Sequence, residues 1–506
     1  MGQNPPWTLS RMRELTMTTS HVIDRLFQVE IPEPSTQKVS PPAGRDKTFR
    51  PYDQHQTFLL PPSLDDWLPA GHSARFISET VDSALDLSLV YDAYTNATGA
   101  PPFDPAMMAK LLLYGYSVGV TSSREIERRC SIDVAFRWLS ANAAPDYRSI
   151  SRFRRRHLGA LEDLFTQVLV LCSEAGLVRL GRVALDATKV RAATSRHKAM
   201  SYDRMDRRIE ELRSEVRAML GEAEATDAEE DEEFGEDRRG DELPPELATK
   251  EARLAAILKA KAAIEAEARE KAAREATKKA LAQGASPEEV ERLTEHAQNT
   301  AVVNPRAQRN FTDPDARIMK TADGSFHYCF NAQAVVDEHA QVILSTTLVQ
   351  DATDVHQLTP MIQATAEQLT RAGVTASPRV LLADAGYCST NNIDATAGGP
   401  SQVLIATGRQ QHGERVSDSP RGRIPTNATS RERMARRLRT KSGRADYARR
   451  KAIVEPVFGQ LKTRQRAGQF RLRGLEGAQG EWILHALCHN LRKLANANSF
   501  GVITTS

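Results

Sequence analysis

Residues 379–387 constrain most strongly what this chain can fold into. An apolar run from Val380 to Ala383 is closed by the carboxylate of Asp384 and followed by Gly386. A continuous apolar run of this length, ended by turn residues, is typical of a parallel strand that is buried on both faces. Because open α/β sheets bind ligands at the carboxyl ends of their strands, we expect Asp384 to lie at a functional edge.

A second stretch has the same form. Apolar residues 183–185 are followed by Asp186, and Lys189 comes three residues later. We expect another buried strand that delivers its aspartate to the same sheet edge. Neighbouring strands lie about 4.8 Å apart, so Asp186 and Asp384 can share bound ions. The alternative is that each aspartate only caps the turn or helix that follows its strand.

Glu455 lies alone among basic residues near the C-terminus. From Arg431 to Arg473 the sequence holds fifteen Lys or Arg against three acids, a local net charge of +12. Such a density predicts phosphate binding, and an acid within it needs a reason. Glu455 and Lys462 are seven residues apart and share one face of a predicted helix, so that face can carry both a metal ligand and a phosphate contact.

Two strand-end aspartates and a helical glutamate have the chemistry of a carboxylate cage for divalent cations. Phosphodiester transfer needs an activated oxygen nucleophile and a stabilised leaving oxygen, and two ions about 3.5 to 4 Å apart provide both. Mg²⁺, or Mn²⁺ in its place, prefers oxygen ligands, so a few carboxylates suffice. The sequence therefore predicts a metal-dependent nucleic-acid enzyme in which Asp186, Asp384 and Glu455 hold two ions.

Length and composition exclude several classes of protein. The chain has 506 residues and a formal net charge of +3, because an acidic middle offsets a basic C-terminal third. No run of about eighteen apolar residues is present to span a bilayer, so we expect no membrane partner and a cytoplasmic, nucleoid-associated protein. The five cysteines are scattered and include no C-x-x-C pair. This usage argues against both a disulfide framework and a zinc ribbon.

The N-terminal third predicts a flexible tail, residues 1–50, followed by a helical DNA-binding domain, residues 51–178. The third helix of this domain, residues 146–158, is the most informative. Its apolar residues Ile150, Phe153 and Leu158 mark the side that faces a core. Four arginines, Arg148, Arg152, Arg155 and Arg156, lie elsewhere on the helix, away from this side. The pattern resembles a helix-turn-helix reader, whose arginines contact phosphates or guanine edges. An ordinary amphipathic helix with a solvated arginine face is the alternative.

Residues 179–495 predict an α/β domain interrupted by a helical insertion at about 200–300. Apolar positions from Met205 onward have coiled-coil spacing, the densely acidic residues 221–246 indicate a solvated loop, and a second long helix covers residues 247–283. We expect the insertion to serve dimer contacts or regulation.

After the insertion the pattern returns to strands. A hairpin of two strands, residues 326–336 and 341–349, precedes a helix and then the strand that ends at Asp384. Without the insertion this order resembles the ribonuclease-H-like core. The predicted fold class is therefore α/β: a ribonuclease-H-like mixed sheet with a coiled-coil insertion, an all-helical domain before it and a tail, residues 496–506, after it.

Two further groups have structural explanations that compete with a functional one. His485, Cys488 and His489 have helical spacing that suits a metal face, but their apolar neighbours favour a packed helix. Asp351 and Asp354 rival Asp384 for a place in the acidic site, yet they precede a helix and suit capping better.

Three acidic motifs, residues 185–189, 383–387 and 447–462, resemble those of bacterial insertion-sequence DDE transposases of the group eleven-eighty-two type. Residues 110–116 and 150–156 resemble the helical domain that precedes the catalytic core in that group, and the resemblance covers about residues 47–495. It implies that Asp186, Asp384 and Glu455 are the catalytic, metal-binding triad.

The resemblance also implies DNA contacts near the glutamate. Lys462 would contact DNA beside the cleaved phosphate, and the further candidates are Lys189, Tyr447, Arg450 and Lys451. The broader signature has tyrosine seven and arginine four positions before the glutamate, where this chain has Ala448 and Lys451. Tyr447 and Arg450 are each displaced by one position.

We therefore expect a transposase that binds the terminal inverted repeats of its own element, acts as a homodimer on double-stranded DNA, cleaves strands at the ends and joins the freed 3′-hydroxyls to target DNA. A ribonuclease-H-like nuclease or resolvase that cleaves without joining is one alternative. A catalytically dead, transposase-derived DNA-binding regulator is another, and the complete set of three acids argues against it.

Overall fold

The computed structural model describes residues 63–94, 101–194, 199–234, 245–408, 420 and 422–499. The predicted N-terminal tail, residues 1–50, lies outside these ranges, as does most of the predicted C-terminal tail. No helix in the described ranges is long and apolar enough to cross a membrane.

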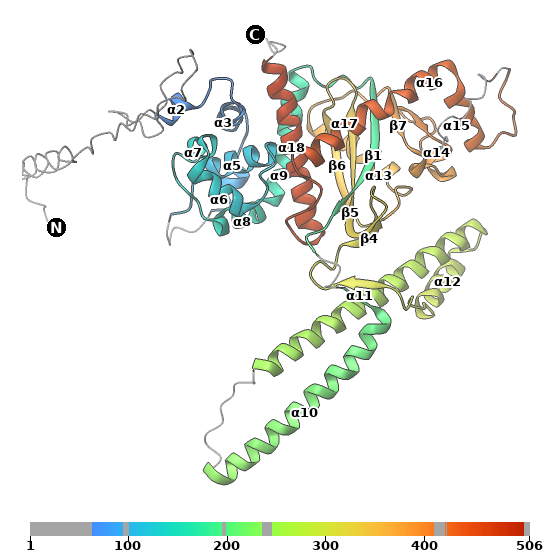
Figure 1. Ribbon diagram of the computed structural model, residues 1–506. Helices are drawn as coiled ribbons and strands as arrows, with labels where there is room; N and C mark the ends of the chain where they lie inside the picture. Colours follow the sequence, from blue (N-terminus) through green and yellow to red (C-terminus); the bar gives the residue numbers. More distant parts are fainter. Residues whose placement is uncertain are drawn as a thin grey trace, which may run out of the picture. The chain divides into compact units, whose positions relative to one another are not determined.

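Short helices make up the described chain up to Glu174, as predicted (Figure 1). They are α2 (Leu64–Trp67), α3 (Ser73–Ser83), α4 (Ser88–Tyr91), α5 (Pro105–Ser117), α6 (Ser123–Ile132), α7 (Val134–Leu139), α8 (Tyr147–Arg156) and α9 (Leu158–Glu174). Helix α8 buries Ile150 and Phe153, as its apolar spacing predicts, but it also buries Arg154. Its N-cap, Asp146, accepts hydrogen bonds from the backbone N–H groups of Arg148 and Ser149, which fixes where the basic helix begins.

A mixed six-stranded sheet follows. Its strands are β1 (Arg182–Arg191), β4 (Arg317–Lys320), β5 (Phe326–Asp337), β6 (Ile343–Val349), β7 (Val380–Ala383) and β8 (Gln402–Ile405). The order is β4-β5-β1-β7-β8, and β6 also pairs with β5. Strand β1 pairs antiparallel with β5 and parallel with β7. The predicted hairpin, the predicted strand before Asp384 and the mixed character of the sheet are therefore confirmed.

Helices from the C-terminal third of the chain accompany this sheet, and most of them contact its strands (Figure 1). They are α13 (Leu358–Arg371), α14 (Thr390–Ala395), α15 (Ser430–Arg439), α16 (Lys441–Ala448), α17 (Arg450–Thr463) and α18 (Gly474–Ser499). Helix α17 contacts β1 and β5, whereas α13 and α18 contact β6, and α18 also packs against α9 and α5. One continuous apolar core runs from Leu68 to Ala497, so the N-terminal helices and the sheet share their interior.

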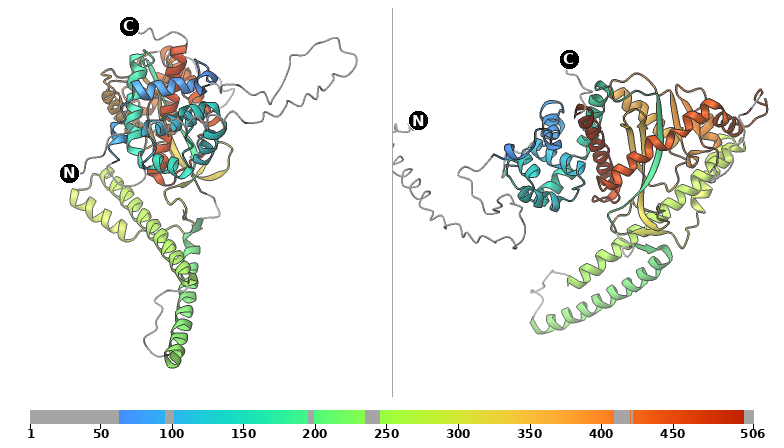
Figure 2. Two further views of the ribbon diagram at one scale, coloured as in Figure 1. Left: turned by 90° about the vertical axis from the view of Figure 1, so that its left-hand side faces the viewer. Right: turned by 45° about the horizontal axis from the view of Figure 1, so that its top comes forward.

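The insertion between β1 and β4 has a small core of its own. It comprises β2 (Ala199–Ser201), α10 (Tyr202–Phe234), α11 (Pro245–Ala282), α12 (Pro287–Asn299) and β3 (Gln308–Asn310). Met205, Ile209 and Leu212 of α10 form a cluster with Ile257 and Ile264 of α11, separate from the main core. The two long helices run side by side (Figure 2). The two predicted long helices are confirmed. The loop predicted at residues 221–246 is wrong for residues 221–234, because α10 continues to Phe234 through alanine and glutamate residues that favour helix. Residues 235–244 lie outside the described ranges.

Candidate active site

Asp186 and Asp384 lie side by side at the centre of the sheet. The parallel register of β1 and β7 pairs Leu185 with Ala383, so the two aspartates are the next residues on neighbouring strands. Asp384 caps a short 3₁₀ turn, Ala385–Tyr387, and its Oδ1 accepts a hydrogen bond from Gly386 N (2.8 Å). The cap uses Oδ1 alone, and Oδ2 makes no hydrogen bond to the described residues. Capping and a place in an acidic site are therefore compatible for Asp384.

The Asp186 carboxylate is held in a partly desolvated position, with 18% of its side chain exposed. Burial raises the pKa of Asp186, and the neighbouring charge of Asp384 raises it further, against the opposing effect of Arg450. Two like charges in a partly buried place favour a bound cation, and carboxylate oxygens are the ligands that Mg²⁺ and Mn²⁺ prefer. The pair therefore fits a divalent metal.

Arg450 supplies a positive charge to this pair. Its Nη1 donates to Asp186 Oδ2 (2.8 Å), and only 11% of its side chain is exposed. Tyr447 of α16 is three residues before Arg450. Its hydroxyl donates to the carbonyl of Ala383 (3.3 Å), the residue before Asp384. The displaced Tyr447 and Arg450 are thus at the site, while Ala448 and Lys451, which occupy the positions of the broader signature, are exposed.

A third carboxylate, Asp354, lies beside Asp384. A Cβ built on Gly386 would lie 3.0 Å from Asp384 Oδ1 and 3.3 Å from Asp354 Oδ2, so both side chains flank this glycine. Asp354 Oδ1 accepts hydrogen bonds from Asn331 (2.6 Å) and Gln333 (3.1 Å) of β5. It also forms an ion pair with Lys189 Nζ of β1 at 3.4 Å.

The capping role expected for Asp351 and Asp354 is not observed. The N-cap of α13 is Gln357, and no side chain caps that helix. Asp351 instead accepts a hydrogen bond from the Gln357 side chain (3.0 Å). Sequence spacing alone could not reveal the partners of Asp354, because Lys189 and the amides of β5 reach it only when the sheet is assembled.

Glu455 lies on α17 between two points at which that helix contacts β1. Arg450 binds Asp186, and Lys462 Nζ donates to the carbonyl of Lys189 (3.5 Å). A rise of 1.5 Å per residue puts Glu455 about 7.5 Å along the helix from Arg450. Glu455 shares its face with Lys462, is exposed, and makes no hydrogen bond or ion pair with the described residues.

The structure thus brings Asp186 and Asp384 together but does not draw Glu455 into one cluster with them. Among the described residues, no group of three or more His, Cys, Asp or Glu is close enough to hold a metal. The same finding fits the packed-helix interpretation of His485, Cys488 and His489. All three are buried in α18, and His489 Nε2 donates to the carbonyl of Gln341 (2.9 Å).

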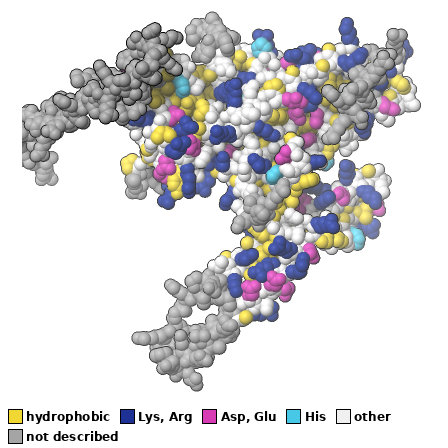
Figure 3. Space-filling view, in the orientation of Figure 1, with side chains coloured by type: hydrophobic (Ala, Val, Ile, Leu, Met, Phe, Trp, Pro, Cys, Tyr) yellow, Lys and Arg dark blue, Asp and Glu magenta, His cyan; other side chains and the backbone are white. Residues whose placement is uncertain are grey.

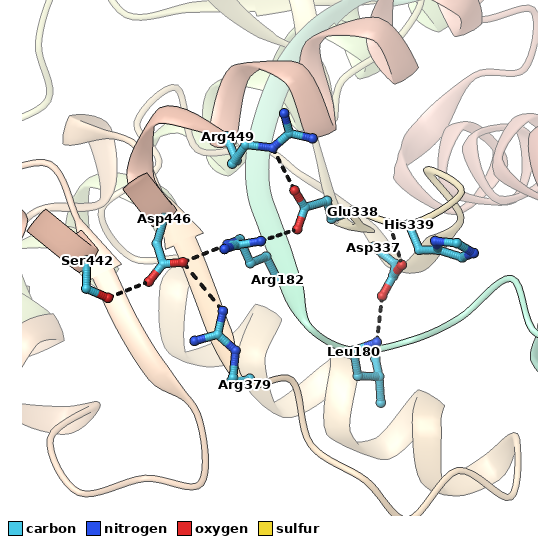
Figure 4. Close-up of polar contacts among 9 residues, drawn as sticks. All are labelled: Leu180, Arg182, Asp337, Glu338, His339, Arg379, Ser442, Asp446 and Arg449. Carbon is cyan, nitrogen blue, oxygen red and sulfur yellow. Dashed lines mark hydrogen bonds and ion pairs between the residues drawn. The ribbon is translucent and has the colours of Figure 1, made fainter. Parts of the chain in front are cut away.

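An ion network fixes the position of α17 against the sheet (Figure 4). Arg182, at the start of β1, donates to Asp446 of α16 (2.7 Å) and to Glu338 (2.9 Å). Arg449 at the N-cap of α17 donates to the same Glu338 (2.7 Å), and Arg379 lies 3.4 Å from Asp446. These contacts hold α16 and α17 against the start of β1. They therefore help to place Arg450 beside Asp186, which lies four residues after Arg182 on the same strand.

The other predicted DNA-binding residues differ in exposure. Lys189 and Lys462 are partly buried, and burial lowers the pKa of each. The four predicted arginines of α8 are all exposed. Arg156 donates to the carbonyl of Ala93 and lies over the Tyr94 ring, 4.6 Å from its centroid. Figure 3 shows Lys and Arg side chains spread over the surface around α6 and α8.

Two protein families match parts of the chain. Residues 62–156 match the family described as Transposase domain (DUF772), and residues 304–491 match the family described as Transposase DDE domain. The second match contains Asp384 and Glu455, whereas Asp186 precedes it and is separated from it by the helical insertion. No curated protein and no solved structure matches the chain. With two transposase domains in sequence and a ribonuclease-H-like mixed sheet, the chain belongs to the DDE transposases of insertion sequences.

Proposed function

We propose that this transposase binds the terminal inverted repeats of its element, cleaves DNA strands at the ends and joins the freed 3′-hydroxyls to target DNA. The observation that carries the proposal is the side-by-side position of Asp186 and Asp384 at the ends of paired parallel stretches. A partly buried pair of carboxylates beside the basic residues 431–473 can hold cations next to a phosphodiester.

Enzymes with a DDE transposase domain depend on divalent metal. We propose two ions, Mg²⁺ or Mn²⁺, held by Asp186 and Asp384, with Glu455 as the third ligand. Such ions supply activation of the attacking oxygen and charge stabilisation at the leaving oxygen. Glu455 lies on the face of α17 that also carries Lys462, and Lys462 contacts β1. A change in the rotamer of Glu455 on DNA binding would direct its carboxylate towards the aspartate pair.

The chain's own cations would position the DNA. Arg450 balances the charge of Asp186 and fixes the orientation of its carboxylate. Lys189 lies on the same strand as Asp186 and forms an ion pair with Asp354. Lys462 donates to the carbonyl of Lys189. Such cations can bind the phosphates on either side of the cleaved bond. Tyr447 and the exposed Lys451 would extend this contact along the DNA strand.

The exposed arginines of α8 would bind the duplex at a distance from the cleaved bond. Arg148, Arg152, Arg155 and Arg156 lie on a helix whose beginning and core-facing side are fixed by Asp146, Ile150 and Phe153. Phosphate contacts of this kind position the protein, and reading of base edges would add preference for the element's own ends. We propose that the enzyme acts on these ends as a homodimer.

The test is strand cleavage with end-labelled DNA that carries the two ends of the element. Asp384→Asn should abolish cleavage and leave end binding in a gel-shift assay nearly unchanged, because the substitution removes a metal ligand and keeps the side-chain volume. Asp394→Asn is the matched control, since Asp394 is an exposed aspartate of α14. Normal cleavage by Asp384→Asn would refute the assignment of the site.

A second assay separates the proposed reaction from the two alternatives. Pre-cut ends that bear a 3′-hydroxyl are incubated with supercoiled target DNA and Mg²⁺ or Mn²⁺. A transposase joins the ends to the target, a nuclease or resolvase nicks without joining, and a DNA-binding regulator only shifts the DNA. Absence of joined product with active, DNA-bound protein would contradict the strand-transfer step.

A further inference from the structure

A basic cleft of about 520 Å³ lies between α8 and the segment that leads from α17 into α18. We call it the α8 cleft, and its polar and charged lining residues are Ser151, Arg154, Arg155, Arg471, Arg473 and Glu476. Four arginines face a single carboxylate. The cleft joins two parts of the chain that match different transposase families, residues 62–156 and 304–491.

Arg154 lines the cleft although 95% of this residue is buried, with a relative exposure of 5%. Its Nη1 donates to the hydroxyl of Tyr116 (2.6 Å) and to the carbonyl of Thr121 (3.0 Å). Its Nε is also buried, and it has no hydrogen-bond acceptor in the described part of the chain. A buried donor without an acceptor is destabilising, so the positive charge of Arg154 is only partly satisfied by the described residues behind the cleft.

Both walls of the cleft are tied to one buried carboxylate, Glu481 of α18. Glu481 Oε1 accepts a hydrogen bond from the Tyr116 hydroxyl (3.1 Å), which in turn accepts one from Arg154. Glu481 Oε2 accepts from the backbone N–H groups of Arg471 (2.7 Å) and Leu472 (2.9 Å). Glu481 is 1% exposed, so this network is sheltered from water. The cleft is therefore preorganised. Glu481 lies on the buried side of this network and is linked to Arg154 through the Tyr116 hydroxyl.

The other three arginines are not neutralised by a carboxylate of the described residues, so they can bind an anion. Arg155 Nε donates to the carbonyl of Ser151 (3.4 Å), and Arg473 Nε donates to the carbonyl of Ala193 (3.3 Å). Arg155, Arg471 and Arg473 are exposed, and none forms an ion pair with a carboxylate of the described residues. Glu476 is the one acid in the lining, so the open side of the cleft carries an excess of positive charge.

We propose that the α8 cleft binds a backbone phosphate of the DNA duplex, with Arg155, Arg471 and Arg473 as its contacts and Arg154 as its fixed floor. The proposal rests on the proposed function, because it names a further place at which the element's end is held. Duplex DNA is favoured over a small free anion because the cleft is continuous with α8, whose exposed arginines extend the basic surface.

The position of the cleft predicts which phosphate it binds. Ala193 of the lining is seven residues after Asp186 along β1 and its extension. Seven residues of extended chain span at most about 25 Å. Duplex DNA advances 3.4 Å per base pair, so the bound phosphate should lie roughly seven base pairs from the cleaved bond or closer.

The test combines charge-removing variants with neutral phosphates. Arg471→Ala/Arg473→Ala alters exposed side chains and spares the buried Arg154, and circular dichroism with thermal unfolding shows that the fold is kept. Loss of one phosphate contact should lower the salt slope of end binding by about 0.9 and weaken binding about fivefold at 0.15 M salt. Arg292→Ala, on exposed α12, is the matched control and should bind as the wild type does.

Methylphosphonate substitution, one phosphate at a time, locates the contact. Wild-type protein should show interference at one phosphate within roughly seven base pairs of the cleaved bond, and the double variant should lose this interference alone. An unchanged salt slope and an unchanged interference pattern would overturn the cleft assignment while wild-type cleavage still supports the proposed function. If wild-type protein neither binds nor cleaves the ends, the proposed function itself fails.

Discussion

The ion pair between Arg450 and Asp186 gives the sharpest test of how charge is balanced at the site. Arg450 Nη1 lies 2.8 Å from Asp186 Oδ2, and two unit charges about 4 Å apart attract each other by about 4 kcal/mol at an effective dielectric constant of about 20. Desolvation of Arg450 offsets part of this attraction, because both side chains are largely buried. We therefore expect Arg450→Gln to lower the free energy of unfolding by about 2 to 4 kcal/mol in the absence of metal.

Urea unfolding of wild type and Arg450→Gln, in EDTA and in Mg²⁺ or Mn²⁺, measures this effect. A divalent cation bound by Asp186 and Asp384 would replace the lost positive charge, so metal should stabilise the variant more than the wild type. Arg449→Gln is the matched control: Arg449 is 56% exposed, pairs with Glu338, and should contribute about 1 kcal/mol or less whether or not metal is present. Equal stability of Arg450→Gln and wild type in EDTA, or equal stabilisation of both by metal, would refute the reasoning.

Three further variants test other parts of the structure. Asp354→Asn should slow cleavage about 10- to 100-fold with end binding kept, because Lys189 loses its partner beside the site; an unchanged rate in the cleavage assay would contradict this. Burial lowers the pKa of His485 and of His489 to about 3, so the unfolded chain binds more protons and stability is lost as the pH falls below about 6.5. Each histidine should lower the free energy of unfolding of the wild type by about 2 kcal/mol at pH 5. The double variant His485→Gln/His489→Gln should lose this pH dependence in unfolding measurements. Equal pH dependence of the variant and the wild type would argue against buried neutral rings. Leu212→Ala should destabilise the α10–α11 hairpin by about 2 to 5 kcal/mol in hydrogen exchange without changing protection of the sheet, and equal loss in both would show that they unfold together.

Local patterns predicted the elements that carry the two aspartates. An apolar run that ends at an acid defines β7, and the same pattern defines the first part of β1, because a strand buried on both faces has little choice of residue type. The start of α8 also agrees with the helix predicted at residues 146–158, since Asp146 caps it. The two long helices of the insertion were predicted from coiled-coil spacing and helix propensity.

Contacts between distant parts of the chain could not be predicted in this way. Arg450 reaches Asp186 across 264 residues, and Asp354 finds Lys189 across 165 residues. Arg154 belongs to a helix with several arginines, and it is distinguished by its hydrogen bond to the Tyr116 hydroxyl, which in turn donates to Glu481. These positions depend on the register of strands and on helix packing, which a single sequence does not encode locally.

The central claim is that Asp186, Asp384 and Glu455 converge on divalent metal when the enzyme holds a DNA end. Anomalous scattering from Mn²⁺ in crystals of the protein bound to a pre-cut end tests it most directly. We predict one or two manganese peaks about 2.1 Å from oxygens of Asp186 and Asp384, with the Glu455 carboxylate turned in from α17 to the same ions. Manganese bound elsewhere, or Glu455 still facing solvent in a complex that cleaves DNA, would contradict the account.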